Sequence, residues 1–285
     1  MPSAGERPRP AWAARRRRAT RLKDECPHVA AVLASYLGVL DLQEPLYASS
    51  RDGRWPDLRN PDATPRLALE RLPFESLARP FGEFIAELGA VMPDTLKAES
   101  AAVATADVGL RAELLRAAAG RRPRELGGDR TRPETAPQEF FCRAFLQPVA
   151  EALAHRHAPS QSPDAGAPCP TCGWPPQLAL LRDEPDAQGA RSLVCSLCAS
   201  EWAFARTVCV NCGERDAERL DYHVADSLPH VRIEACASCR TYLKVVDLRA
   251  EGSPAPLVDE IASVELDLWC DEQGLVKLQR NLFGM

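Results

Sequence analysis

The stretch CPTCGWPPQLALLRDEPDAQGARSLVCSLC, residues 169–198, contains two Cys-x-x-Cys pairs with twenty-two residues between them. A second stretch of the same form, CVNCGERDAERLDYHVADSLPHVRIEACASC, covers residues 209–239. Corresponding cysteines in the two stretches are 40 or 41 residues apart, so this region is an internal repeat. A unit this short cannot bury enough apolar surface to fold unaided, which indicates that a bound metal stabilises each copy.

Each Cys-x-x-Cys pair is predicted to form a tight turn, here called a knuckle, that directs two thiolates toward one ion. The glycine that follows Cys172, like the one that follows Cys212, allows the left-handed backbone that such a turn needs. Two knuckles supply four sulfurs in a tetrahedron, a donor set that suits zinc or rubredoxin-type iron. The sequence therefore predicts two metal ions, iron or zinc, each held by four cysteines.

The repeat also indicates which cysteines share an ion. If each copy is self-sufficient, the ligands are Cys169, Cys172, Cys195 and Cys198 in the first site and Cys209, Cys212, Cys236 and Cys239 in the second. The repeat favours this grouping over the alternative, a cross-brace in which the first knuckle pairs with the third. Because cysteine fills every position, we expect closed structural sites, or sites that exchange one electron if they hold iron. A redox-active Cys-x-x-Cys pair is disfavoured, since each pair has a partner.

The chain as a whole predicts an α+β protein of about two domains, since it has 285 residues and 45% of them are hydrophobic. Before the cysteines the pattern is helical; Leu77, Phe81, Phe84, Ile85 and Leu88, for example, recur on one helix face. Long loops are expected near residues 45–65 and 121–137. The expected organisation is a disordered basic tail at 1–22, a helical domain at 23–157, a linker at 158–168 and a double metal-binding domain at 169–285, with repeats at 169–206 and 209–247 and a C-terminal helix and tail at 254–285.

The arginine-rich start superficially resembles an export signal, because an uncharged stretch, Val29–Leu40, follows it. However, Asp24 and Glu25 interrupt the pattern, and no small-residue cleavage site follows Leu40. Twelve residues are also too few to cross a bilayer. Eight of the eleven cysteines lie in metal-type pairs, which agrees with a reducing compartment. We therefore expect a cytoplasmic protein without membrane insertion.

The remaining candidate residues are expected to be structural. Cys26, Cys142 and Cys270 have no paired cysteine nearby in sequence and are predicted to be buried. The four histidines considered as ligands are expected at a helix end or within the second repeat: His155, His157, His223 and His230. The sequence contains no Gly-rich phosphate loop, no nucleophile elbow and no zinc-protease helix, so we expect no catalytic residues and no enzymatic activity.

Several segments together resemble the FdhE family of formate dehydrogenase accessory proteins. The segments are CPTCGWPP, CSLCASEW, CVNCG, ACASCRTYLKVVDL and LDLWCDEQGLVKLQRNLFG, with FLQPVAEAL ahead of the cysteines, and they cover about residues 140–285. The resemblance implies a cytoplasmic protein with a helical N-terminal domain and a rubredoxin-like or zinc-ribbon double metal domain. It also implies a non-catalytic role in maturing a respiratory formate dehydrogenase by binding its catalytic subunit. The family's eight metal cysteines correspond to the eight ligands proposed above.

Two other functions remain as alternatives. The first is a zinc-ribbon regulator that binds nucleic acid. Residues 168–249 carry 9 Lys and Arg against 11 Asp and Glu, and the whole chain has a net charge of −5, so we expect no nucleic-acid partner. The second is a rubredoxin-like electron-transfer protein, which would require iron in the two sites.

Overall fold

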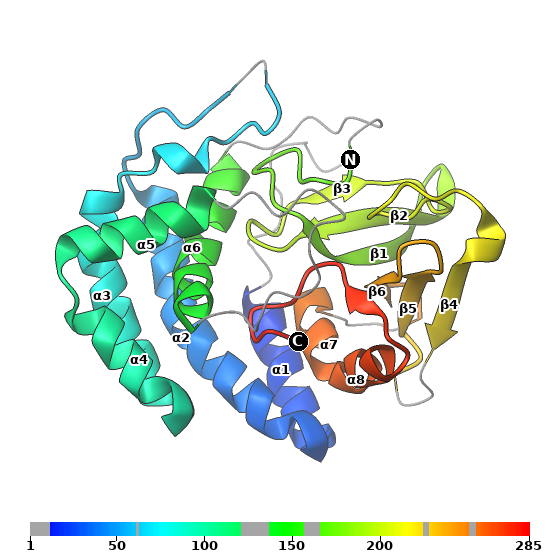
Figure 1. The fold of residues 1–285 in the computed structure, drawn as a ribbon, viewed down its shortest axis with the longest axis horizontal. Helices are drawn as coiled ribbons and strands as arrows, with labels where there is room; N and C mark the ends of the chain where they lie inside the picture. Colours follow the sequence, from blue (N-terminus) through cyan, green and yellow to red (C-terminus); the bar gives the residue numbers. More distant parts are fainter. Residues whose placement is uncertain (1–11, 61–62, 121–136, 157–165, 225–227, 251–254) are drawn as a thin grey trace.

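The computed structural model describes residues 12–60, 63–120, 137–156, 166–224, 228–250 and 255–285. Helices from the first half of the chain gather on one side, and a seven-stranded sheet from the second half forms the other (Figure 1). The last two helices, α7 (Pro256–Ala262) and α8 (Val264–Glu272), follow the sheet in sequence and lie beneath it in the view of Figure 1. The predicted α+β class, with a C-terminal helical segment, is confirmed.

The helical part is built around α6 (Pro137–Arg156), which is buried on nearly every side. Its neighbours are α2 (Ala30–Asp52), α3 (Phe74–Val91), α4 (Asp94–Thr105) and α5 (Val108–Gly120), with short 3-10 helices at Pro27–Val29 and Leu69–Arg71. A helix that is apolar all round needs such neighbours on every face. The predicted apolar stripe on α3 is buried. The rings of its Phe81 and Phe84 meet the ring of Phe145 in α6 edge to face, with ring centroids 5.3 and 5.6 Å apart.

The prediction of a disordered tail at residues 1–22 is wrong for residues 12–22. They belong to helix α1 (Trp12–Glu25), while residues 1–11 lie outside the described part of the chain. Trp12, Ala19 and Leu22 fall on one helix face at spacings of seven and three residues, and all three are buried. The arginines between them are not simply solvated, because Arg18 is also buried, in an ion pair with Asp259 of α7.

Helix α2 extends to Asp52, so the expected loop near residues 45–65 begins later than predicted. Pro45 lies inside the helix, and the turn after it continues because Tyr47 packs against Trp12 at 5.6 Å. Residues 27–52 are long and apolar enough to cross a membrane by length and composition, the one such helix among the described residues. In this structure the segment packs against α1, α3 and α6 instead. The expected loop at 121–137 lies outside the described residues, apart from Pro137.

The sheet confirms the internal repeat. Each copy contributes a knuckle, a two-stranded hairpin, a second knuckle and a third strand. The first copy forms β1 (Pro176–Glu184), β2 (Ala187–Cys195) and β3 (Glu201–Ala203), and the second forms β4 (Leu220–Val224), β5 (Val231–Cys236) and β6 (Thr241–Asp247), preceded by a 3-10 turn at Ala217–Arg219. The strand order is β3-β2-β1-β6-β5-β4, and β7 (Val276–Lys277) pairs with β6. The copies meet where β1 runs parallel to β6, with Leu178 opposite Lys244.

A buried lysine holds the C-terminal helices against the sheet. Lys244 of β6 is fully buried and donates hydrogen bonds to the carbonyl oxygens of Glu260 and Ser263, at 2.8 and 2.9 Å. It also donates to the carboxylate of Asp267 at 2.6 Å. Lys277 is ion-paired with both Glu260 and Asp267. These bonds satisfy buried charges that would otherwise destabilise the fold, and they set the position of α7 and α8.

The helical part and the sheet share one hydrophobic core. Phe81 of α3, Phe145 of α6, Leu193 of β2 and the cysteine Cys169 all belong to the same cluster of buried residues. The predicted linker at residues 158–168 lies mostly outside the described part of the chain. Two continuous regions of sequence thus pack into one body, and the boundary between them is lined by side chains from both.

Candidate metal centres

The first centre consists of Cys169, Cys172, Cys195 and Cys198, whose sulfur atoms all lie within 4.8 Å of one another. The Cys169–Cys198 and Cys172–Cys195 sulfur pairs are 3.7 and 3.4 Å apart. The first knuckle closes with a hydrogen bond from the backbone nitrogen of Gly173 to the Cys169 carbonyl at 2.8 Å, and Gly173 has the left-handed φ of +80°. Backbone nitrogens of Leu197 and Cys198 point at the Cys195 sulfur at 3.4 Å.

The second centre repeats this construction with Cys209, Cys212, Cys236 and Cys239. The Cys209–Cys239 and Cys212–Cys236 sulfur pairs are both 3.7 Å apart. Gly213 has a φ of +77°, and its backbone nitrogen donates to the Cys209 carbonyl at 3.0 Å. The knuckles group as the self-sufficient repeat predicts, and the cross-braced pairing does not occur.

The geometry of both centres fits a four-thiolate metal ion. A metal–sulfur distance of about 2.3 Å in a tetrahedron places the sulfurs about 3.8 Å apart, close to the spacings found. A disulfide would bring two sulfurs to about 2.05 Å, and none of the eight cysteines forms one. The donor set therefore suits zinc or iron and leaves no coordination position for water.

A cation would favour the ionised forms of these thiols. Burial and the neighbouring thiols raise the pKa of Cys172 and Cys195, whereas hydrogen bonds from the other three cysteines lower the pKa of Cys169 despite its burial. In the second centre burial opposes ionisation, but hydrogen bonds from Asn211 and Thr241 lower the pKa of Cys239 to about 7. Four neighbouring thiolates repel one another, and a bound divalent cation would stabilise their ionised forms.

The helical part covers both knuckles of the first centre. The backbone nitrogens of Arg66 and Leu67 donate to the carbonyls of Pro170 and Thr171 at 3.1 and 2.8 Å. On the second knuckle, the amide of Gln147 in α6 donates to the Ser196 carbonyl at 3.0 Å. The first centre therefore lies at the junction between the helices and the sheet, where its knuckles form part of the contact.

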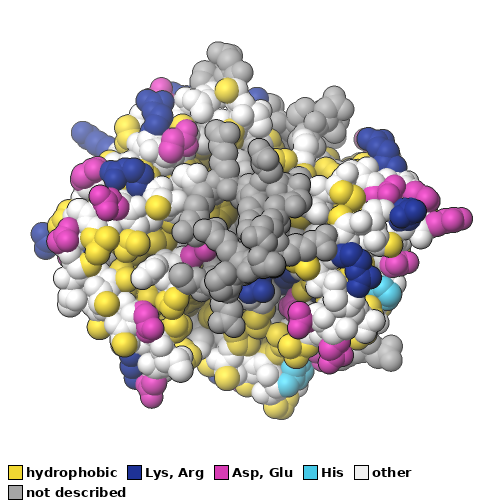
Figure 2. Space-filling view, in the orientation of Figure 1, with side chains coloured by type: hydrophobic (Ala, Val, Ile, Leu, Met, Phe, Trp, Pro, Cys, Tyr) yellow, Lys and Arg dark blue, Asp and Glu magenta, His cyan; other side chains and the backbone are white. Residues whose placement is uncertain are grey.

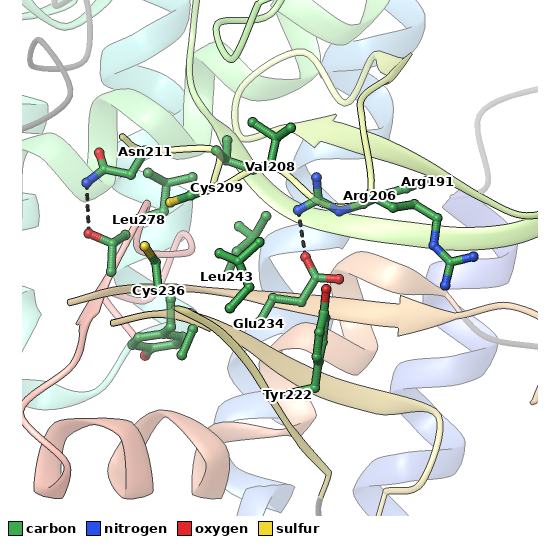
Figure 3. A pocket seen from close by; sticks show the side chains of 15 residues that line it. Arg191, Arg206, Val208, Cys209, Asn211, Tyr222, Glu234, Cys236, Leu243 and Leu278 are labelled. Atoms are coloured by element: carbon green, nitrogen blue, oxygen red, sulfur yellow. Dashed lines mark hydrogen bonds and ion pairs between the residues drawn. The ribbon is translucent and has the colours of Figure 1, made fainter. Parts of the chain in front are cut away.

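The second centre borders a pocket instead (Figure 3). Cys209 and Cys236 line one end of it, and the pocket encloses about 370 Å³ including its open mouth. Glu234 on its floor accepts hydrogen bonds from Arg191 at 2.6 Å and from Arg232 at 3.1 Å. Beside the cysteines, Asn211 donates a hydrogen bond to the Thr241 hydroxyl at 2.9 Å. This bond joins the first knuckle of the second copy to β6. One wall of the second centre is thus open to approaching molecules.

Comparison with known proteins places this metal domain in a family. Residues 168–206 match the family model described as FdhE, central domain, and residues 207–283 match the one described as FdhE, C-terminal domain. Over residues 168–283 the chain is similar to the FdhE family. The boundary between the two matched domains, at residues 206 and 207, coincides with the boundary between the two copies of the repeat.

Individual FdhE relatives match a similar region. An FdhE homologue of Aquifex aeolicus is 39% identical over 145 residues, which are 51% of this chain and 51% of that protein. An FdhE homologue of Stutzerimonas stutzeri is 38% identical over 115 residues, 40% of this chain and 37% of that protein. The matched segments thus span about half or less of these curated relatives. The crystal structure of the FdhE protein from Pseudomonas aeruginosa aligns with 97% of this chain and 96% of its own, with a TM-score of 0.67 and 23% identity, so the whole chain shares that fold.

The other candidate residues of the protein have structural surroundings. Cys142 and Cys270 are buried as predicted, and Cys26 is half-buried. His155 shares a hydrogen bond with the Tyr47 hydroxyl at 3.3 Å, and His223 packs against Trp269 with ring centroids 4.6 Å apart and the rings tilted by 51°. His157 lies outside the described residues.

Sequence reasoning missed a charged network that joins α1 to the rest of the protein. Arg15 forms a two-bond ion pair with Glu151 of α6 at 2.9 and 3.0 Å. Arg18 and His230 both bind the Asp259 carboxylate, at 2.5 and 2.9 Å. The signal that could have revealed the helix is the stripe of Trp12, Ala19 and Leu22, which the surrounding arginines obscured.

Proposed function

We propose that this chain is a non-catalytic accessory protein for the maturation of a respiratory formate dehydrogenase, and that it binds the catalytic subunit of that enzyme in the cytoplasm. The observation that carries this proposal is the match of residues 168–206 and 207–283 to the two FdhE domains, with all eight cysteines in place. The matched relatives are covered only in part, so the role of the whole protein is inferred from this shared region.

A binding role agrees with the chemistry of the two centres. We infer that the eight cysteines of the two centres hold two metal ions, iron or zinc. Iron would add one-electron exchange, and zinc would not. Because cysteine fills all four positions in each centre, the metals have no open position at which a substrate could be activated. Such centres can keep a binding surface rigid.

The charges on the surface support a protein partner over a nucleic-acid partner. On the face drawn in Figure 2, described Lys and Arg side chains are interspersed with Asp and Glu over both the helical part and the sheet. Phosphate binding depends on a continuous positive surface. The apolar helix at residues 27–52 packs against three other helices, which agrees with a protein that is not inserted in a membrane.

The test is a binding experiment with the full chain prepared without oxygen. The immobilised protein is offered the catalytic subunit of a formate dehydrogenase, once before and once after cofactor loading, with duplex DNA and RNA as competitors. We expect stoichiometric retention of the unloaded subunit in high salt, weaker retention of the loaded enzyme, and no turnover of formate by the chain alone. Retention of nucleic acid in place of the subunit would contradict the proposal.

A further inference from the structure

The two centres are equivalent in sequence but differ in their exposure to solvent. In the first centre all four cysteines are buried, with exposed fractions between 0 and 7%. In the second centre only Cys236 is buried; Cys209 and Cys239 are half-buried and Cys212 is exposed. Cys172 and Cys212 occupy the same position in the two copies, the second cysteine of the first knuckle. The difference between them therefore arises from what packs on each copy and not from the local sequence.

The glycines after these two cysteines report the same asymmetry. A Cβ added to Gly173 would lie 3.2 Å from the Pro65 side chain, because the loop before α3 rests on this knuckle. A Cβ added to Gly213 would meet no described atom within 4 Å. The first centre also receives the backbone bonds from Arg66 and Leu67 and the bond from Gln147. The metal of the first centre can therefore become exposed to solvent only if the helical part separates from the sheet.

The second centre can open without such a separation. Cys212 in its first knuckle is exposed, and Cys209 and Cys236 line the pocket of Figure 3. Local opening costs less free energy than global unfolding, and segments with few buried contacts open first. A ligand-exchange reaction at this centre therefore needs only the detachment of one knuckle.

We propose that the second centre is an exchangeable metal site, from which the ion is released and reloaded in the folded protein through Cys212. The ion of the first centre stays bound as long as the protein is folded. In the exchange, each metal–sulfur bond that breaks is replaced by a bond from the incoming ligand, and freed thiolates take up protons from water. No electron is transferred. The acceptor or donor of the ion is a soft chelating group, such as a thiol or an aromatic nitrogen ligand. This inference rests on the proposal that both centres hold metal.

The experiment measures metal release from the full chain into a chromogenic pyridylazo chelator, under conditions in which circular dichroism shows a folded protein. We expect two phases of one metal each, with the fast phase at least about a hundredfold faster than the slow one. After the fast phase, iodoacetamide should alkylate the four cysteines of the second centre and leave the four cysteines of the first centre unmodified. Peptide mapping identifies the alkylated residues, which should be Cys209, Cys212, Cys236 and Cys239. This mapping needs no variant.

Two matched variants assign the phases. Cys212→Ser should remove the fast phase and leave the slow one unchanged, and Cys172→Ser should remove the slow phase. The inference would be overturned if both metals were released at one rate, or if the cysteines of the first centre were labelled during the fast phase. Either result would count even if the chain still binds the formate dehydrogenase subunit. A purified chain without metal would instead contradict the metal assignment itself, so the two failures are distinguishable.

Discussion

Arg143, in the middle of α6, donates a hydrogen bond to the backbone carbonyl of Asn281 at 3.1 Å, across 138 residues of sequence. A second bond from the same guanidinium reaches the Arg280 carbonyl at 3.2 Å. Arg143 is only 1% exposed, and this burial lowers its pKa. The last strand of the protein and the residues after it are thus held to the central helix by a buried charge.

Replacing Arg143 with methionine should loosen this attachment. We expect a loss of about 1.5–3 kcal/mol in the free energy of unfolding, the range for hydrogen bonds to a charged group, and faster amide hydrogen exchange in residues 278–285. Urea unfolding and exchange mass spectrometry measure the two effects. Arg79→Met is the control, because Arg79 forms an exposed ion pair with Glu83 and its loss should cost less than about 1 kcal/mol. Equal losses for the two variants would show that residues 280 and 281 are not held by Arg143.

The glycines of the two first knuckles allow a second comparison. Gly173→Ala and Gly213→Ala both place a Cβ at a left-handed φ, of +80° and +77°, which costs about 1–2 kcal/mol at each site. Only the Cβ at position 173 would also press on Pro65. We expect Gly173→Ala to be the more destabilising variant in urea unfolding of the metal-loaded protein. If Gly213→Ala were equally damaging, the loop before α3 would not rest on the first centre.

The ion pair between Arg18 and Asp259 predicts that α1 is required for stability. Arg18→Met leaves a fully buried carboxylate whose described partners are then the titratable His230 ring and the backbone nitrogen of Ala255, and we expect a loss of about 3–5 kcal/mol. Arg16 lies on the same helix but pairs with Asp41 at the surface, so Arg16→Met should cost less than about 1 kcal/mol. Thermal unfolding of both variants checks this difference. A disordered segment at residues 12–25 would make the two substitutions indistinguishable.

Asp267 gives a prediction about pH. Burial would raise its pKa, but the charges of Lys244 and Lys277 lower it below the ordinary value. An unfolded aspartate titrates near pH 4, so the ionised group contributes its full stability above that pH and loses it as the pH falls through the folded pKa. Asp267→Asn should therefore cost about 3 kcal/mol at pH 7.

The cost of Asp267→Asn should begin to decrease below about pH 4, where the unfolded carboxylate takes up a proton that the folded one does not, and it should be lost as the pH falls through the lowered folded pKa. Urea unfolding of both proteins at several pH values measures the difference, and protonation of the metal thiolates cancels because it affects both alike. A difference that stays constant between pH 7 and pH 3 would contradict the lowered pKa.

The sequence predicted the fold class, the repeat and the grouping of the cysteines because these depend on local spacing. A Cys-x-x-Cys turn is formed by neighbouring residues, and its glycine is visible at positions 173 and 213. The second knuckles were less readable, since Ala199 and Arg240 take the left-handed conformation there without a glycine.

Two features could not be predicted, because they depend on residues far apart in the chain. Helix α1 is ordered by Glu151 and Asp259, which lie 136 and 241 residues from their arginine partners. The burial of the first centre depends on a loop and a helix that no pattern within the repeat specifies. Tertiary packing, and not local preference, distinguishes the two centres.

The parallel pairing of β1 with β6 joins the two copies through unlike edges, since β6 is the third strand of its copy and β1 is the first strand of the other. Head-to-tail contacts of this kind form an open series unless the rotation between copies closes a ring. Gene duplication could therefore lengthen the sheet one copy at a time, each addition reusing the same junction beyond β4. At the opposite end, β3 has only three residues, which limits further pairing there. The sheet could thus gain further copies of the repeat at its β4 edge, whereas the short strand β3 limits additions at the other edge.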